Sequence, residues 1–139
     1  PWMVPAGAMS FSTTRVPRSI AEARSAIQFD RLTMALLIKG PNFEQLESDP
    51  GGLQDAHMAH LADLHESGDL LAAGPLLHET YRGLSILRVE PQRALELKRQ
   101  DEAVRAGRYR VEAHPWLVPA GAIRFFRTRL PRSMAEVSA

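Results

Sequence analysis

The segment LQDAHMAHLADLHESGDLLAAGPLL (residues 53–77) predicts a helix that leads directly into a strand. At 100° per residue, one side of the helix collects two leucines and two histidines, and we expect this side to be buried. These residues are Leu53, His57, His60 and Leu64. Gly68 predicts the end of the helix. The apolar residues that follow predict a short strand, which Gly74 and Pro75 end.

Further strands and one further helix are predicted on either side of this segment. They are a strand over residues 32–39, a strand over residues 81–90, a helix over residues 91–106 and a strand over residues 109–118. Pro115 requires an edge position or a bulge in the last strand. The order strand, helix, strand, strand, helix, strand predicts an α+β fold of the ferredoxin-like class. Both helices would then cover one face of an antiparallel sheet, and a second subunit or a second unit of the chain would cover the other.

Asp101 falls on the apolar side of the second predicted helix. A buried carboxylate without a partner is costly, on the order of several kcal/mol, so we expect a cation or a hydrogen-bond donor beside it. The two helices would lie side by side, and a histidine of the first helix is therefore the natural candidate. Such a pair could pass protons to and from a bound substrate. A buried histidine is more often a core residue with its hydrogen bonds satisfied, so a structural role stays open.

A metal site is a weaker interpretation of the histidines. His57 and His60 have the spacing of a helical pair, and His65 and His78 are near in sequence. The pattern lacks the glutamate of the zinc-binding HExxH motif, and the chain has no cysteine. No glycine-rich phosphate loop and no dinucleotide-binding fingerprint occurs in the sequence. We therefore predict neither a metal nor another cofactor.

Charge and composition limit the partners and the compartment. The chain has 17 basic and 16 acidic residues, a net charge of +1, which gives no case for a nucleic-acid partner. No apolar run approaches the roughly 20 residues that a membrane helix needs, so no membrane association is predicted. The absence of cysteine excludes disulfides and thiolate chemistry and fits a reducing compartment, for which we expect the cytoplasm.

The two ends of the chain repeat one another. Residues 1–25 match residues 115–139 at 15 of 25 positions, an offset of 115 − 1 = 114 residues. A tandem array of such units is the simplest explanation, and a rearranged sequence is the alternative. We expect residues 1–26 to be the tail remnant of a preceding unit, residues 27–120 the domain and residues 121–139 a C-terminal tail. Residues 1–8 would then pair along a sheet edge, in this chain or in a partner subunit, as residues 115–122 do.

Several segments resemble one known family. The stretch AHMAHLADLHESGDLLAAGPLL (residues 56–77) resembles the signature of the YCII-related (YciI-like) family, in which a helix carrying histidine leads into a Gly-x-Leu-Leu-x-x-Gly-Pro strand. Three further matches follow in order: YRGLSILRVE (residues 81–90), DEAVRAGRY (residues 101–109) and VEAHPW (residues 111–116). The resemblance covers roughly residues 32–119.

The resemblance implies a ferredoxin-like α+β fold of the dimeric α/β-barrel kind, with homodimers or higher homo-oligomers formed through the sheets. It also implies an enzyme with a His–Asp pair, which falls on His57 and Asp101 here. The family usually has proline directly after that aspartate, whereas this chain has Glu102. The helix could therefore continue through this point and change the direction of the carboxylate. The position of His60 varies in the family and implies no conserved role.

Together these observations predict a cofactor-independent lyase or isomerase that acts on a small cyclic or phenolic organic molecule. His57 would transfer the proton and Asp101 would orient it. Four residues are the predicted substrate-binding set: His60, Gly74, Pro75 and Trp116. Trp116 would form an aromatic wall or lie at a dimer edge. The alternative is a non-catalytic small-ligand-binding or assembly module with a structural His57–Asp101 pair. The enzyme hypothesis requires the two side chains to lie within about 5 Å and to open onto a cleft.

Overall fold

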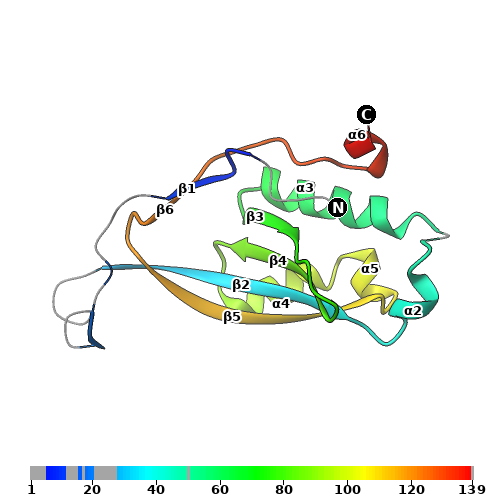
Figure 1. The fold of residues 1–139 in the computed structure, drawn as a ribbon, viewed down its shortest axis with the longest axis horizontal. Helices are drawn as coiled ribbons and strands as arrows, with labels where there is room; N and C mark the ends of the chain where they lie inside the picture. Colours follow the sequence, from blue (N-terminus) through cyan, green and yellow to red (C-terminus); the bar gives the residue numbers. More distant parts are fainter. Residues whose placement is uncertain (1–5, 12–15, 17, 21–27, 50, 139) are drawn as a thin grey trace.

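The computed structural model describes residues 6–11, 16, 18–20, 28–49 and 51–138, which form an α+β protein with antiparallel sheets (Figure 1). The larger sheet has the strand order β3-β4-β2-β5. Its strands are β2 (Phe29–Lys39), β3 (Leu70–Pro75), β4 (Tyr81–Leu87) and β5 (Tyr109–Pro119). The longer helices are α3 (Leu53–Glu66) and α4 (Pro91–Lys98), and shorter ones are α2 (Phe43–Leu46), α5 (Glu102–Arg105) and α6 (Met134–Ser138).

The strands lie close to the segments that the sequence predicts. The apolar run at residues 32–39 forms most of β2, which is an inner strand and pairs with β4 and β5. β5 is an edge strand, and Pro115 lies in it opposite Thr33. The prediction of an edge position for this proline is confirmed, because a missing N–H group is tolerated on the unpaired side of such a strand. Gly74 and Pro75 are the last two residues of β3, so the strand ends at this pair and includes it.

The second helix differs from its prediction. The sequence predicts one helix over residues 91–106, but α4 ends at Lys98 and α5 begins at Glu102. Asp101 has the extended conformation, with φ −66° and ψ 127°, and its carboxylate accepts a hydrogen bond from the backbone N–H of Ala103. The aspartate therefore caps a new helix instead of continuing the old one. Glu102 in place of the family's proline does not extend the helix.

Helices α3 and α4 cover one face of the large sheet, where α3 contacts β3 and α4 contacts β2 and β5. The main core lies between these layers and includes Ala35, Leu61, Leu64, Leu87 and Leu97. The opposite face carries a smaller apolar cluster of Leu32, Leu71, Ile86 and Val118. Ile123 and Phe125 of strand β6 (Ile123–Phe125) pack against this cluster, so part of the second face is covered by the chain's own C-terminal segment.

The repeated ends of the chain pair with one another. Strand β1 (Met9–Phe11) lies antiparallel to β6, and the two lie side by side in Figure 1. Ser10 is opposite Arg124, and the repeat offset of 114 makes these two residues equivalent, since 10 + 114 = 124. The strands β1 and β6 are therefore related by a local two-fold axis through this pair. The predicted pairing of residues 1–8 falls mostly on residues 1–5, which lie outside the described residues, while the Ala8 carbonyl accepts a hydrogen bond from Phe126.

The C-terminal segment returns from β6 to the outer side of α3 and ends in α6 (Figure 1). Leu130 is buried in the main core, and the backbone N–H of Met134 donates to Asp55 on α3. This segment therefore closes one side of the space next to α3. Within the described ranges, no helix has the length and apolar character that crossing a membrane requires.

Candidate active site

A cavity of about 440 Å³ lies between the large sheet and α3. The strands β2, β3 and β4 line it from one side, α3 from another, and the first residues of β5 and the C-terminal segment complete its wall. Six of its polar or strand-end residues matter below: His57, Gly74, Pro75, Ser85, Arg108 and Tyr109. The volume suits a small organic molecule rather than a polymer.

His57 and Asp101 form a buried pair at this cavity. His57 Nδ1 lies 2.5 Å from Asp101 Oδ2, while Asp101 Oδ1 accepts the hydrogen bond from Ala103 N–H. The aspartate is 0% exposed and the histidine 8% exposed. With both carboxylate oxygens held, the imidazole ring is fixed in orientation. Since Nδ1 is engaged, Nε2 is the ring nitrogen left to meet a molecule in the cavity.

The carboxylate of Asp101 favours its ionised form. Burial alone would raise its pKa, but the hydrogen bond and the charge of His57 and the Ala103 N–H outweigh that effect and lower the pKa from its ordinary value. An ionised Asp101 accepts a hydrogen bond from the Nδ1–H group of a neutral His57. It also stabilises the imidazolium that forms when Nε2 takes up a second proton. The pair is therefore equipped to accept and return one proton.

The structure brings part of the predicted substrate-binding set to the cavity. Gly74 and Pro75 of β3 line it, as expected from the sequence. His60 does not: it lies one turn further along α3, and its Nε2 is buried without a hydrogen-bond partner among the described residues. Burial lowers the pKa of His60, although Asp101 acts in the opposite direction. His60 is therefore a neutral neighbour of the His–Asp pair.

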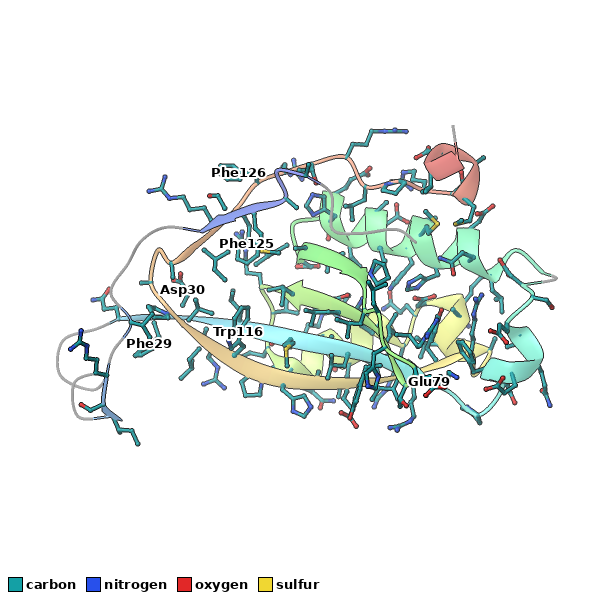
Figure 2. The ribbon with its side chains drawn as sticks, viewed as in Figure 1. Phe29, Asp30, Glu79, Trp116, Phe125 and Phe126 are labelled. Atoms are coloured by element: carbon teal, nitrogen blue, oxygen red, sulfur yellow. The ribbon has the colours of Figure 1, made fainter. Side chains whose placement is uncertain are left out.

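Trp116 lies far from the cavity. It is opposite Leu32 in the β2–β5 ladder, whereas Tyr109, at the cavity, is opposite Lys39. Seven residues along a strand span about 23 Å. The side chain also belongs to the other face, because the two residue numbers differ in parity. In Figure 2 the label of Trp116 lies between those of Phe29 and Glu79.

The sequence analysis missed a lysine–serine pair beside the cavity. Lys98, at the end of α4, is 0% exposed, and its Nζ lies 2.7 Å from Oγ of Ser85 on β4. Burial lowers the pKa of Lys98 to about 8, although Asp101 acts to raise it. Ser85 lines the cavity. An isolated lysine near a helix end carries no sequence signal for such a position, since lysine there usually reaches solvent.

Arg108 is a second residue that the sequence analysis missed. It is 8% exposed, it lines the cavity, and its Nε and Nη1 have no hydrogen-bond partner among the described residues. Asp49 Oδ1 lies 4.0 Å from Nη1 and is itself buried without a partner. The guanidinium also lies 5.4 Å from the ring of Tyr109, whose centroid is 5.7 Å from that of His57. Burial raises the pKa of the Tyr109 hydroxyl, against the effect of Arg108.

The histidines do not assemble into a metal site. Within the part of the chain that the structure describes, no three histidine, aspartate or glutamate side chains converge in a way that could hold an ion. His65 has both ring nitrogens engaged, by the Leu70 carbonyl and by Thr128 N–H. His78 lies before β4 and accepts from the N–H groups of Thr80 and Tyr81.

Comparisons with family models, with curated proteins and with solved structures gave no match to this chain. The class that the fold and the site define is an α+β protein with a buried His–Asp pair at a small cavity.

Proposed function

We propose that this protein is a cofactor-independent enzyme of the lyase or isomerase type that performs acid–base chemistry on a small organic molecule. The observation that carries the proposal is the His57–Asp101 pair, with 2.5 Å between Nδ1 and Oδ2, in the wall of a cavity of about 440 Å³. Both conditions that the enzyme hypothesis sets, a close pair and an adjoining cleft, are met. Cyclic and phenolic compounds are the substrate class that the family resemblance implies.

The chemistry would proceed through one proton at His57. Neutral His57 accepts a proton from a substrate carbon or hydroxyl at Nε2, and the electron pair of the broken bond stays on the substrate as an enolate or phenolate. Asp101 stabilises the imidazolium through Nδ1–H. Returning the proton to a different carbon completes an isomerisation. Expulsion of a leaving group by the electron pair completes an elimination, with the proton released to solvent or to that group.

The proposal includes a ferredoxin-like fold and membership of the YCII-related family. Two observations support it. Counted along the chain, the four strands of the large sheet take the order second, third, first, fourth, with a helical segment between the first and second and another between the third and fourth. The residues that the resemblance pairs, His57 and Asp101, are in contact.

We further propose a cytoplasmic homodimer. Support for the dimer comes from the face of the sheet opposite the helices, where β6 covers one cluster while Trp116 remains 36% exposed. The cysteine-free sequence supports a reducing compartment.

A ligand screen by thermal shift tests the site. Lactones, phenols and small keto acids would be screened against wild type, His57→Ala and His114→Gln. His114 lies on β5 with 54% of its side chain exposed and serves as the control. We expect ligands that raise the melting temperature of wild type and of His114→Gln but lose most of this effect with His57→Ala. A ligand that stabilises all three proteins equally would argue against a site at His57.

The non-catalytic alternative predicts a different pattern. A module whose His57–Asp101 pair is structural would lose stability on substitution of either residue, yet it would leave every bound ligand chemically unchanged. Measurement of ligand turnover therefore separates the two functions.

A further inference from the structure

The Lys98–Ser85 hydrogen bond has a fixed direction. An ammonium group can only donate, so Ser85 Oγ must accept the bond from Lys98 Nζ. The hydroxyl hydrogen of Ser85 then has to point elsewhere, and no other hydrogen bond of this hydroxyl occurs among the described residues. Ser85 is opposite Ala73 in the β3–β4 ladder, and both residues line the cavity. The hydroxyl is therefore available as a donor to a molecule inside the cavity.

Lys98 lacks a directly paired anion. It is fully buried, and no carboxylate of the described residues lies within salt-bridge distance of its Nζ. Burying an ammonium group is costly unless a counter-charge and hydrogen bonds compensate it. A negatively charged oxygen at the Ser85 hydroxyl would supply part of that counter-charge through a short donor chain, from Lys98 to Ser85 to the ligand.

Arg108 provides a second group of donors to the same cavity. Its Nε and Nη1 are buried without a hydrogen-bond partner among the described residues, and the ion pair of Nη1 with Asp49 Oδ1, at 4.0 Å, is too long for a hydrogen bond. Nη1 lies on the Cδ side of the guanidinium and Nε–H points to the opposite side, so each can donate a separate charge-assisted hydrogen bond to a carboxylate oxygen. Asp49 Oδ1 accepts no hydrogen bond within the same part of the chain and suits a hydroxyl group of the same ligand.

The two groups of donors lie at different positions along the length of β2. Ser85 is opposite Ala35 of β2, and Tyr109, which follows Arg108, is opposite Lys39 of the same strand. Four residues along β2 correspond to about 13 Å. Glu47 lines the cavity as well as Asp49, so an anion without a donor group would be repelled at that end. The complementary ligand therefore has oxygen acceptors at both ends and a hydroxyl near the carboxylate.

We propose that the cavity binds a small hydroxylated organic acid, whose carboxylate is held by Arg108 and whose second oxygen acceptor is held by the Ser85 hydroxyl on Lys98. This proposal names the substrate class of the proposed enzyme. It rests on the proposed function only for the position of the substrate beside His57. Nothing in the family resemblance assigns a role to Ser85, Lys98 or Arg108.

Calorimetric titration with matched pairs of ligands tests the proposal. The probes are 4-acetyl-2-hydroxybenzoate, 4-methoxycarbonyl-2-hydroxybenzoate and 4-acetylmandelate, each paired with its neutral amide, because each has a hydroxyl beside the carboxylate and a carbonyl oxygen at the opposite end. We expect at least one acid to bind the full chain about tenfold or more tightly than its neutral amide, since a charge-assisted hydrogen bond contributes that much. Arg108→Gln should remove the preference for the acid. Arg110→Gln, which changes a largely exposed side chain, should keep it.

The Ser85–Lys98 arm has its own variants. Ser85→Ala changes little volume and should weaken acid binding about tenfold while the protein stays folded, as checked by circular dichroism. Lys98→Met should weaken acid binding to a similar degree. If the affinity of wild type for the acid falls between pH 7 and pH 9, Lys98→Met should lack that fall. If Ser85→Ala and Arg108→Gln bind the acids as wild type does, or if the amides bind as tightly as the acids, the proposal is wrong. The proposal is equally wrong if none of the three acids binds with a dissociation constant below 10 mM, which corresponds to a binding free energy of about −2.7 kcal/mol.

His57→Gln separates this proposal from the proposed function. An acid that binds His57→Gln and wild type with similar affinity, yet undergoes no reaction with wild type, would support the acid site and argue against catalysis. Turnover of a neutral compound through His57, without binding of any acid, would support catalysis and argue against the acid site.

Discussion

At the scale of single residues, Asp101 has two functions that its sequence position does not separate. One carboxylate oxygen caps α5 and the other holds His57. Replacement by alanine removes both interactions from a fully buried position. We expect Asp101→Ala to destabilise the protein by roughly 3–5 kcal/mol, as breaking a buried pair usually does. Urea unfolding measures this, and a loss below 1 kcal/mol would contradict a charged, fully buried pair.

The same residue predicts a pH dependence. The pKa of Asp101 is lower in the folded protein than in the unfolded chain, where it is about 3.9. Its stabilising contribution is therefore complete above that unfolded value and is lost as the pH falls through the lower, folded one. Comparing the unfolding free energy of wild type and Asp101→Asn from pH 6 to pH 2 should show a steeper acid loss in wild type. Parallel curves would contradict the lowered pKa.

Lys98 predicts a rise in stability with pH in the alkaline range. Its folded pKa of about 8 lies below the ordinary value of 10.5, so the unfolded chain binds more protons between these values. The free energy of unfolding should therefore rise with pH above about 8, by up to roughly 1.4 kcal/mol for each pH unit. Near the ordinary tyrosine pKa of 10.0 the rise is opposed, because burial raises the pKa of Tyr109 and this acts against stability as the unfolded chain loses its phenolic proton. Lys98→Met should lack the rise, and an equal rise in the variant would contradict this assignment.

The sequence predicts the His57–Asp101 contact and the positions of Gly74 and Pro75 at the cavity, but not the rest of the site. Helical periodicity suffices for His57, whereas Asp101 is buried for a different reason, since it caps α5 instead of lying within a helix. Trp116 was placed by its aromatic character, and the two-residue alternation of β5 puts it on the wrong face. Lys98 and Arg108 are buried through contacts between elements distant in sequence, which no local pattern encodes.

At the scale of elements, the break between α4 and α5 explains why Glu102 is compatible with the fold. Asp101 has φ −66° and ψ 127°, the conformation that a residue before proline prefers. Glu102 is the first residue of α5, where proline is favoured. Glu102→Pro should therefore keep the structure and stabilise it by about 0.4–1 kcal/mol. Thermal unfolding measures the change.

Ala103→Pro is the matched control for that substitution. It removes the N–H group that Asp101 holds, at a fully buried position. We expect a loss of about 1 kcal/mol or more, which is typical of a lost helix cap. Destabilisation by Glu102→Pro as large as that by Ala103→Pro would mean that α4 and α5 are one continuous helix.

The helix break also shows where sequence patterns reach their limit. The residues of α5 are good helix formers, so propensity favours continuation from α4. The cap formed by Asp101 outweighs that preference. The strands of the large sheet were predictable because each has its own apolar pattern. β1 and β6 were not, because three-residue strands are defined by a partner 114 residues away.

At the scale of the whole molecule, the pairing of β1 with β6 uses the repeat as a local two-fold interface. Ser10 lies opposite its equivalent Arg124, and Met9 and Phe11 each lie opposite the equivalent of the other, as they would around the axis of a symmetric dimer. The chain contains no cysteine, so Ser10→Cys with Arg124→Cys introduces the only thiols. Opposite residues of antiparallel strands are close enough for a disulfide. We expect oxidation to link the two cysteines within one chain.

Non-reducing electrophoresis and mass spectrometry distinguish the possible products. A covalent dimer at low protein concentration would instead show that residues 6–11 exchange into a partner subunit, contrary to the pairing within one chain. The Ser10→Cys single variant is the control, since it should form no covalent dimer under oxidation if copies of β1 do not meet.

The central claim is that His57 transfers protons to and from a molecule in the cavity. The most direct measurement is nuclear magnetic resonance of a bound ligand in D2O, which follows deuterium incorporation at the ligand's acidic C–H position. Wild type and His114→Gln should accelerate exchange for at least one ligand of the thermal-shift screen, and His57→Gln should reduce the rate by 100-fold or more, on the order of the usual contribution of a general base. Equal exchange rates for wild type and His57→Gln, with every ligand still bound, would contradict the claim.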